Sequence, residues 1–333
     1  METHMKILFI GGTGIISTSC VERALEKGLD LTLLNRGRSF RPVPQGIKTI
    51  NADIHDPQAL SAALVGYDFD VVVDWIAFTP QDVQRDVELF RGKIAQYVFI
   101  SSASAYQTPA SSLPIRESTP LENPHWQYSR NKIACEELLL REYRSTKFPF
   151  TIVRPSHTYD QTCLPVEGGY TVIDRMLKDK PVIVHGDGTS IWTLTHSRDF
   201  AKGFIGLLGN SQAVNEVFHI TSDEWLTWNQ IYELLGRAAG VTPKLVHIPS
   251  DLIAAYDENI GASLLGDKSN SSIFDNGKIK QVVPDFLCTT PFSRGAEEII
   301  TWHLAEPTRQ VVDEMFNQMC DRLLENYQKA WPK

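Results

Sequence analysis

The segment that most constrains the fold of this chain lies near its start, where a short apolar run ends in glycines. Residues 6–10 read Lys-Ile-Leu-Phe-Ile and are followed at once by Gly11-Gly12-Thr13-Gly14. An amphipathic stretch begins at Ser17. A buried strand, a tight glycine turn and a helix in this order bring the free N–H groups of the first helical turn close to a bound phosphate. The pattern therefore predicts a nucleotide-binding turn.

The first half of the chain continues to alternate apolar runs with amphipathic stretches. Further strands are expected at Leu29–Leu34, Ile47–Asn51, Val71–Trp75, Tyr97–Ser101 and Phe150–Arg154. Helices are expected at Ser17–Lys27, Pro57–Leu64, Pro80–Phe90 and Trp126–Tyr143. This alternation is typical of an α/β protein with a doubly wound parallel sheet, which binds its ligand at the carboxyl ends of the strands.

The pattern loosens after Arg154-Pro155. We expect residues 5–165 to form the nucleotide-binding domain and residues 166–333 mainly a smaller substrate-binding lobe, with segments near 181–220 returning to the main sheet. Strands are expected at Pro181–Val184 and Val217–Ile220, and helices at Tyr170–Leu177, Ala201–Leu208 and Trp228–Ala239. Near the end, an apolar stripe at helical spacing predicts a core or subunit contact; it comprises Val311, Val312, Met315, Phe316, Met319, Leu323, Leu324 and Tyr327.

Charge and cysteine content exclude several classes of protein. The formal net charge is −8 and no basic run stands out, so nucleic acid is not expected as a main partner. The five cysteines are widely spaced and lack any Cys-x-x-Cys, which predicts neither a disulfide framework nor a metal site. The apolar run at 7–10 is too short for a signal peptide, and no stretch is long enough for a membrane helix. A cytoplasmic protein is expected.

The glycine turn suggests which residues bind a dinucleotide. Gly11 and Gly14 occupy the first two positions of the spaced glycine motif, and Ser17 replaces the third glycine. We expect Gly11, Gly14, Ile15 and Ile16 to contact the cofactor, because they form the turn and lie just before the expected helix.

The end of the second strand bears on the choice between NAD and NADP. A chain strict for NAD often places an acidic residue there, whereas this one has Asn35-Arg36-Gly37-Arg38. Arg36 and Arg38 suit a 2′-phosphate, so NADP is favoured over NAD; the alternative is a pair of solvated loop arginines. Asn35 belongs to the same expected cofactor site. Asp53 and Ile54, which follow the third expected strand, and Ala77, which follows the fourth, are also expected to approach the cofactor.

Tyr128 and Lys132 suggest redox chemistry. Residues four apart lie on one face of a helix, so the ammonium of Lys132 is expected to lower the pKa of the Tyr128 phenol and make it a general acid/base. Ser102, at the end of a predicted strand, would hydrogen-bond the substrate oxygen. The same spacing recurs at Tyr143 and Lys147, but no strand-end serine precedes that copy, so a surface pair is expected there.

Together these segments resemble the extended short-chain dehydrogenase/reductase superfamily, specifically its NAD(P)-dependent epimerase/dehydratase family. The resemblance covers most of the chain and rests on the segments at 11–14, 52–54, 98–106, 128–132, 153–155, 185–189 and 196–199. It implies a Rossmann-type fold with a C-terminal substrate-binding lobe and a catalytic trio of Ser102, Tyr128 and Lys132. It also implies that Tyr128, Lys132 and Pro155 border the cofactor and that the protein is a homodimer.

Departures from the family pattern bear on the substrate. Ala103-Ser104 stand where dehydratases carry an acidic pair, so sugar dehydration is not expected. His157 replaces an asparagine that touches a nucleotide sugar, and Trp192 stands where many relatives bind the diphosphate with arginine. Ser104, His157 and Trp192 are candidate substrate contacts. The alternatives are a hydrogen-bonded loop histidine and a tryptophan packed in the core.

The expected function is oxidoreduction or epimerisation at the hydroxyl of a sugar or nucleotide sugar. Release of the keto intermediate would make the enzyme a dehydrogenase or reductase, and reduction from the other face would make it an epimerase; the sequence leaves both open. A binding protein that senses cofactor or associates with RNA is the alternative from another class, because some relatives with similar glycine loops associate with RNA in plastids and fold alone does not fix function.

Overall fold

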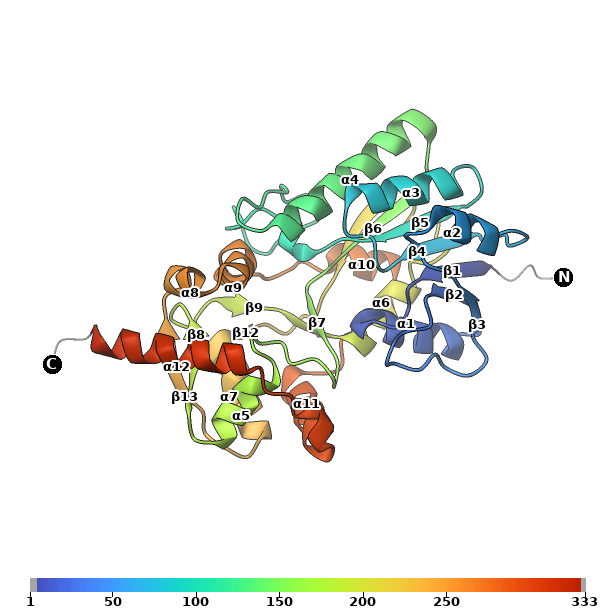
Figure 1. Cartoon of the computed structure of the whole chain (residues 1–333). Helices are drawn as coiled ribbons and strands as arrows, with labels where there is room; N and C mark the ends of the chain where they lie inside the picture. Colours follow the sequence, from blue (N-terminus) through green and yellow to red (C-terminus); the bar gives the residue numbers. More distant parts are fainter. Residues whose placement is uncertain (1–4, 331–333) are drawn as a thin grey trace.

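A seven-stranded parallel sheet forms the centre of the computed structural model, which describes residues 5–330 (Figure 1). The strands are β1 (Lys6–Ile10), β2 (Asp30–Asn35), β3 (Lys48–Asn51), β4 (Val71–Asp74), β5 (Gln96–Ile100), β6 (Phe150–Pro155) and β11 (Glu216–Ile220). Their order is β11-β6-β5-β4-β1-β2-β3. The expected α/β, doubly wound parallel architecture is confirmed, and the six strands predicted in the first half all form.

Helices cover both faces of this sheet (Figure 1). One face carries α1 (Ile15–Glu26) and α6 (Ser197–Ile205), and the other carries α2 (Pro57–Ala63), α3 (Pro80–Phe90) and α4 (Gln127–Thr146). Successive residues of β1 enter opposite cores, with Ile7 and Phe9 packed on the α1 side and Leu8 on the other. All are fully buried, and each contributes about 1.5–3 kcal/mol through burial of its side chain.

The strand order reverses beside β1, which pairs with β2 on one side and with β4 on the other. The connections after β1 and β4 therefore leave toward opposite faces of the sheet. In open parallel sheets this divergence creates a crevice at the carboxyl ends of the strands, where ligands bind. The glycine turn at 11–14 lies at this edge.

Only one of the two strands expected near 181–220 joins the main sheet. β11 pairs in parallel with β6, whereas β8 (Pro181–His185) pairs with β13 (Lys244–Ile248) in a separate two-stranded sheet. The remaining strands are short: β7 (His157–Tyr159) pairs with β10 (Leu194–His196), and β9 (Ile191–Trp192) with β12 (Leu226–Thr227).

The helices of the C-terminal half enclose further apolar cores, except the helix at 277–282, which packs into a core of the main sheet. They are α5 (Tyr170–Leu177), α7 (Trp228–Ala238), α8 (Ser250–Tyr256), α9 (Glu258–Ser263), α10 (Gly277–Val282), α11 (Phe292–Ala305) and α12 (Glu314–Lys329). In the predicted C-terminal stripe, Met319, Leu323 and Leu324 are buried but Val311 and Met315 are exposed. The buried Arg175 binds Asp321 at 2.7 Å and so ties α12 to α5. Within residues 5–330, every helix is too short or too polar to cross a membrane.

Candidate active site

Three adjoining cavities line the crevice at the carboxyl ends of the strands. The arginine cavity, of about 420 Å³, contains Arg36 and Arg38. The central cavity, of about 330 Å³, contains the glycine turn, and the lobe cavity, of about 260 Å³, reaches into the C-terminal half. The first two share Gly11, Thr13, Ile76 and Phe78, and the last two share Ser102, Tyr128, Pro155, Ser156 and Thr158. The shared walls make one continuous groove.

The glycine turn fits the pyrophosphate of a dinucleotide. Gly11 and Gly12 have φ of +95° and +109°, which other residues rarely adopt. A Cβ on Gly12 would lie 2.9 Å from Leu33 Cδ2. α1 begins at Ile15 with no acidic side chain in its first turn, so its N–H groups and dipole favour an anion. Gly11, Gly14, Ile15 and Ile16 all line the central cavity.

The arginine cavity contains most of the residues expected near the other end of the cofactor. Asn35, Arg36, Arg38 and Ile54 line it. Asp53 lies beside Arg36, with 3.8 Å between Oδ2 and Nη1, and its Oδ1 accepts a hydrogen bond from the backbone N–H of His55. That bond, together with Arg36, holds the pKa of Asp53 below its usual range. No carboxylate ends β2, because its last residue is Asn35.

Lys132 anchors α4 to the sheet edge. Its Nζ donates to the carbonyl oxygens of Ala77 and Ile100, both at 2.7 Å. The same nitrogen lies 5.7 Å from the centroid of the Tyr128 ring. Burial lowers the pKa of Lys132 to about 8. Lys132 therefore fixes the backbone on two sides of the central cavity.

The pKa of Tyr128 departs from expectation. Burial raises it above its ordinary value because a phenolate is poorly solvated there. A hydrogen bond with Ser102 opposes this shift, and the negative charge of Asp267 adds to it. The prediction that Lys132 lowers the pKa of Tyr128 was wrong, because burial of the phenol dominates the shift and the Lys132 ammonium is instead bound to two backbone carbonyl groups. At neutral pH the phenol keeps its proton.

A chain of serines orients Ser102. Its Oγ lies 2.9 Å from Ser104 Oγ and accepts a hydrogen bond from the Ser104 N–H at 3.1 Å. Ser129 Oγ in turn donates to Ser104 Oγ at 2.7 Å. Ser104 is buried, with 3% of its surface exposed, although it lines the lobe cavity. The geometry gives it the task of positioning Ser102.

A buried ion pair fixes the strand ends that carry Ser102 and Pro155. Glu136 of α4 accepts hydrogen bonds from Ser101 Oγ at 2.5 Å and from Arg154 Nε at 2.9 Å. Ser101 and Arg154 immediately precede the two site residues. α4 thus holds both walls of the central cavity as well as Tyr128.

The lobe cavity joins aromatic walls to a few polar groups. Trp126, Tyr128, Trp192 and Phe274 line it. Trp192 is 3% exposed and packs against Trp228 with ring centroids 5.5 Å apart, so it is a core residue whose edge reaches the cavity. His157 also lines the cavity, and burial lowers its pKa to about 3. It is neutral at physiological pH and can act there only as a hydrogen-bonding group.

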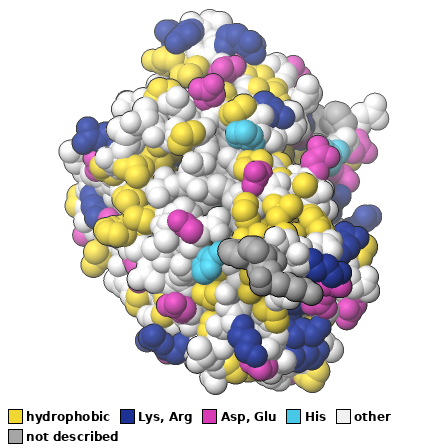
Figure 2. All heavy atoms as spheres, turned by 90° about the vertical axis from the view of Figure 1, so that its left-hand side faces the viewer, with side chains coloured by type: hydrophobic (Ala, Val, Ile, Leu, Met, Phe, Trp, Pro, Cys, Tyr) yellow, Lys and Arg dark blue, Asp and Glu magenta, His cyan; other side chains and the backbone are white. Residues whose placement is uncertain are grey.

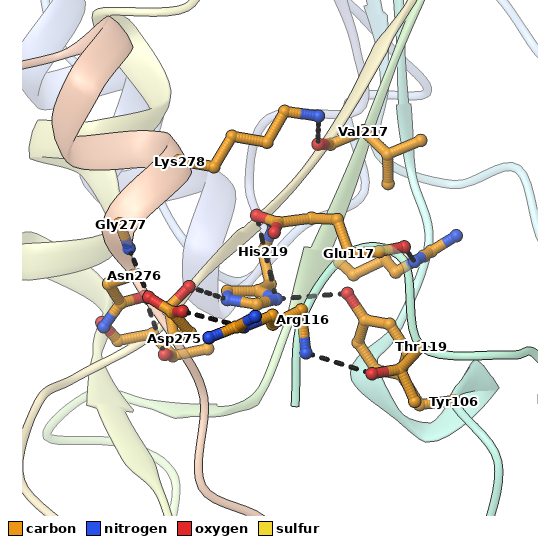
Figure 3. Close-up of polar contacts among 12 residues, drawn as sticks. Tyr106, Arg116, Glu117, Thr119, Val217, His219, Asp275, Asn276, Gly277 and Lys278 are labelled. Atoms are coloured by element: carbon orange, nitrogen blue, oxygen red, sulfur yellow. Dashed lines mark hydrogen bonds and ion pairs between the residues drawn. The ribbon is translucent and has the colours of Figure 1, made fainter. Parts of the chain in front are cut away.

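A polar network links Tyr106 to the C-terminal half of the chain through His219 and Asp275 (Figure 3). The His219 ring lies between Tyr106 and Asp275: its Nε2 donates to the Asp275 carbonyl at 2.8 Å, and its Nδ1 accepts from the Tyr106 hydroxyl at 3.1 Å. The carbonyl can only accept, which assigns the ring proton to Nε2. The network fixes the residues next to Phe274, which lines the lobe cavity.

Residues 7–221 match the model of the NAD dependent epimerase/dehydratase family. The chain belongs to this family. Its expected relation to the extended short-chain dehydrogenases/reductases is thereby confirmed.

Among relatives of this family member, 2'-dehydrokanamycin reductase of Streptomyces kanamyceticus is 24% identical over 290 residues, covering 86% of this chain and 81% of the relative. The chloroplast stem-loop binding protein of 41 kDa b from Arabidopsis thaliana is 28% identical over 261 residues, covering 74% and 66%.

Solved structures of epimerases share the fold. UDP-glucuronic acid 4-epimerase from Bacillus cereus, in complex with UDP-glucuronic acid and NAD, has a TM-score of 0.72 at 20% identity, covering 90% of this chain and 100% of that chain. UDP-glucose 4-epimerase of Thermus thermophilus, in complex with NAD, has a TM-score of 0.70 at 19% identity, covering 89% and 98%. The Rossmann-type fold of this family member is thereby confirmed.

The groove of this epimerase/dehydratase family member also contains residues that sequence reasoning missed. They include Thr13, Phe78, Trp126, Ser156, Asp267, Lys268 and Phe274. Trp126 and Phe78 lie close in sequence to Tyr128 and Ala77, and that closeness could have indicated them. Asp267 has no such signal. Within residues 5–330, no group of three or more His, Cys, Asp or Glu side chains is placed to hold a metal ion.

Proposed function

We propose that this protein is an NAD(P)-dependent oxidoreductase or epimerase that acts on a hydroxyl group of a sugar or nucleotide sugar. The observation that carries the proposal is the position of Tyr128 and Ser102, which line both the central and the lobe cavity. A substrate in the lobe cavity would meet both side chains at the junction with the glycine-turn site. Membership of the family supports the cofactor class.

The proposed chemistry assigns a task to each catalytic residue. A bound nicotinamide supplies the capacity to accept and return a hydride. In oxidation, ionised Tyr128 takes the proton of the substrate hydroxyl while Ser102 holds the oxygen, and the carbon gives up a hydride and becomes a ketone. In reduction, Tyr128 donates that proton to the carbonyl oxygen. The raised pKa of Tyr128 favours its proton-donating role at neutral pH.

We infer a preference for NADP from the arginine cavity. Arg36 and Arg38 line it and β2 ends without a carboxylate, which suits a 2′-phosphate better than a bare ribose hydroxyl. The structures named above contain NAD, so this preference is a property proposed for the present chain alone.

Dehydrogenase and epimerase activities differ in net redox change. A dehydrogenase or reductase converts one equivalent of cofactor for each substrate, whereas an epimerase leaves the cofactor unchanged at completion. Measuring product and reduced cofactor in the same reaction separates them. The similarity to 2'-dehydrokanamycin reductase favours a reductase, and the similarity to solved epimerases favours an epimerase.

A cytoplasmic homodimer remains the expected state of this protein. Light scattering on the purified chain tests whether it is a dimer.

RNA binding is the second candidate, because the chloroplast relative is a stem-loop binding protein. The net charge of −8 opposes it. Figure 2 shows Lys and Arg side chains scattered among Asp and Glu on the face drawn, without a continuous basic surface. Retention of a stem-loop RNA at physiological salt would support this candidate, and release of the RNA would remove it.

A further inference from the structure

The carboxyl group of Asp267 lines the lobe cavity from the C-terminal half of the chain. It belongs to a single π-helical turn, Leu264–Lys268, a rare geometry that occurs mostly at functional sites. Asn123 Nδ2 donates to the carbonyl oxygen of Gly266 at 2.6 Å, and a Cβ on Gly266 would lie 3.0 Å from Trp126 Cβ. The π-turn is therefore packed tightly against the residues that precede Tyr128.

The neighbouring Lys268 has a structural task. Its ammonium donates to Ser263 Oγ at 2.5 Å and lies 3.2 Å from Glu167 Oε1, which compensates its charge. Its carbonyl oxygen accepts hydrogen bonds from the Trp228 indole at 3.2 Å and from Ser190 Oγ at 3.1 Å. These contacts fix the backbone beside Asp267, and the Lys268 ammonium, which also lines the lobe cavity, lies 5.7 Å from the centroid of the Trp126 ring and is paired with Glu167.

Asp267 differs because its carboxylate makes no hydrogen bond or ion pair with any side chain or backbone group in residues 5–330. Burial raises its pKa to about 7, and the charge of Lys268 only partly opposes that shift. No donor in the described part of the chain compensates this carboxylate, whose partly exposed surface opens on the lobe cavity, where only water or a ligand can supply one. The open side of Asp267 is the lobe cavity, so the missing donor is expected on the substrate.

The walls around this carboxylate suit a cation. Trp126, Tyr128 and Phe274 line the same cavity, and aromatic faces attract an ammonium group through their quadrupoles, as the Lys268 ammonium near the Trp126 ring shows. An anion placed there would be repelled by Asp267 in a medium less polar than water.

We propose that Asp267 binds a protonated amine of the substrate, so that the substrate is an amino sugar or a related amino alcohol rather than an anionic nucleotide sugar. The proposal rests on the function proposed above and narrows its substrate class. The ammonium would lie between the carboxylate and the aromatic walls, and the reacting hydroxyl would lie beside Tyr128.

The charges around Asp267 determine how binding should depend on pH. The groups that face the cavity are Tyr128 from α4, His157 from β7 and Lys268 from the π-turn, with Glu167 paired to that lysine. Tyr128 and His157 are neutral near pH 7. Asp267 is ionised above its pKa of about 7, so amine binding should strengthen as the pH rises through that value, while the amine itself remains protonated.

The test measures binding of D-glucosamine, D-glucose and UDP-glucose to the full chain with NADP+ by calorimetry. Because D-glucosamine and D-glucose differ only in one amine, the wild type should bind the former at least about 10-fold tighter, as expected for a hydrogen bond to a charged group. Asp267→Asn should abolish that preference and Asp267→Glu should restore part of it. Asp285→Asn removes an exposed carboxylate outside these cavities and should behave as wild type.

Equal or undetectable binding of the two sugars by the wild type, tighter binding of UDP-glucose, or an amine preference that persists in Asp267→Asn would overturn the proposal. A second readout uses the pH profile of oxidation. Asp267 raises the pKa of Tyr128, so in Asp267→Asn the oxidation rate should begin to increase at a lower pH than in the wild type. An unchanged pH profile would count against the electrostatic interaction between Asp267 and Tyr128. The binding measurements need no turnover, so they can disprove the amine site while the redox function stands. The redox function can likewise be disproved while amine binding is observed.

Discussion

The ammonium of Lys132 donates to the carbonyl oxygen of Ala77 at 2.7 Å and thereby joins the helix that carries Tyr128 to the loop after β4. Lys132→Met should keep the fold, because it removes a buried charge and preserves the side-chain length. It should lower kcat/KM about 10- to 100-fold through loss of hydrogen bonds from a charged group. Steady-state kinetics with a varied cofactor measure this effect. Lys147→Met, at the exposed end of α4, is the control and should leave the rate unchanged.

Gly12 should tolerate no side chain. Gly12→Ala places a Cβ 2.9 Å from Leu33 Cδ2 at a φ of +109°, so we expect a loss of about 1–3 kcal/mol in the free energy of unfolding together with weaker cofactor binding. Gly46→Ala has a similar φ of +93° and open space around it, and controls for backbone strain alone. Urea unfolding and cofactor titration of both variants give the comparison; equal effects would contradict a specific role for the turn.

Arg36 and Arg38 should discriminate between cofactors. The double variant Arg36→Ala/Arg38→Ala should weaken NADP+ binding by at least about 10-fold and leave NAD+ binding nearly unchanged, because only the 2′-phosphate requires the guanidinium groups. Arg294→Ala removes an exposed arginine elsewhere and should alter neither affinity. Similar losses for both cofactors would show that the arginines do not read the 2′-phosphate.

Glu136 should stabilise the fold through its buried ion pair with Arg154. Glu136→Gln leaves Arg154 buried without its partner charge, and we expect a loss of about 3–5 kcal/mol in the free energy of unfolding. Glu142→Gln breaks the more exposed pair with Arg91 and should cost less than about 1 kcal/mol. Chemical denaturation measures both, and a small effect at Glu136 would contradict the bracing role assigned to it.

Local sequence signals predicted the nucleotide-binding half well. The bounds of α3, Pro80–Phe90, follow from a capping Thr79 and a first-turn proline that act within one helical turn. The strand and glycine turn before α1 are equally local. Such signals do not depend on distant parts of the chain.

The substrate side could not be predicted in the same way. Asp267 reaches the lobe cavity because Gly266 packs on Asn123, a contact between segments far apart in the sequence. The pKa of Tyr128 was misjudged for a related reason: its sign depends on burial by residues that only the folded chain brings together. The sequence likewise did not indicate that β8 pairs in parallel with β13, outside the main sheet, because that pairing joins segments far apart in the chain.

The most direct test of the redox role compares Tyr128→Phe with Tyr143→Phe, its counterpart in the second Tyr-x-x-x-Lys copy. Tyr143 packs against Phe150 and belongs to none of the three cavities. The measurement is the rate of product formation by the full chain with NADP+ on addition of amino sugars, sugars and nucleotide sugars, followed by chromatography, with reduced nicotinamide followed by absorbance. We expect wild type and Tyr143→Phe to react alike and Tyr128→Phe to be slower by about 100-fold or more. A Tyr128→Phe variant that reacts at the wild-type rate would contradict the account.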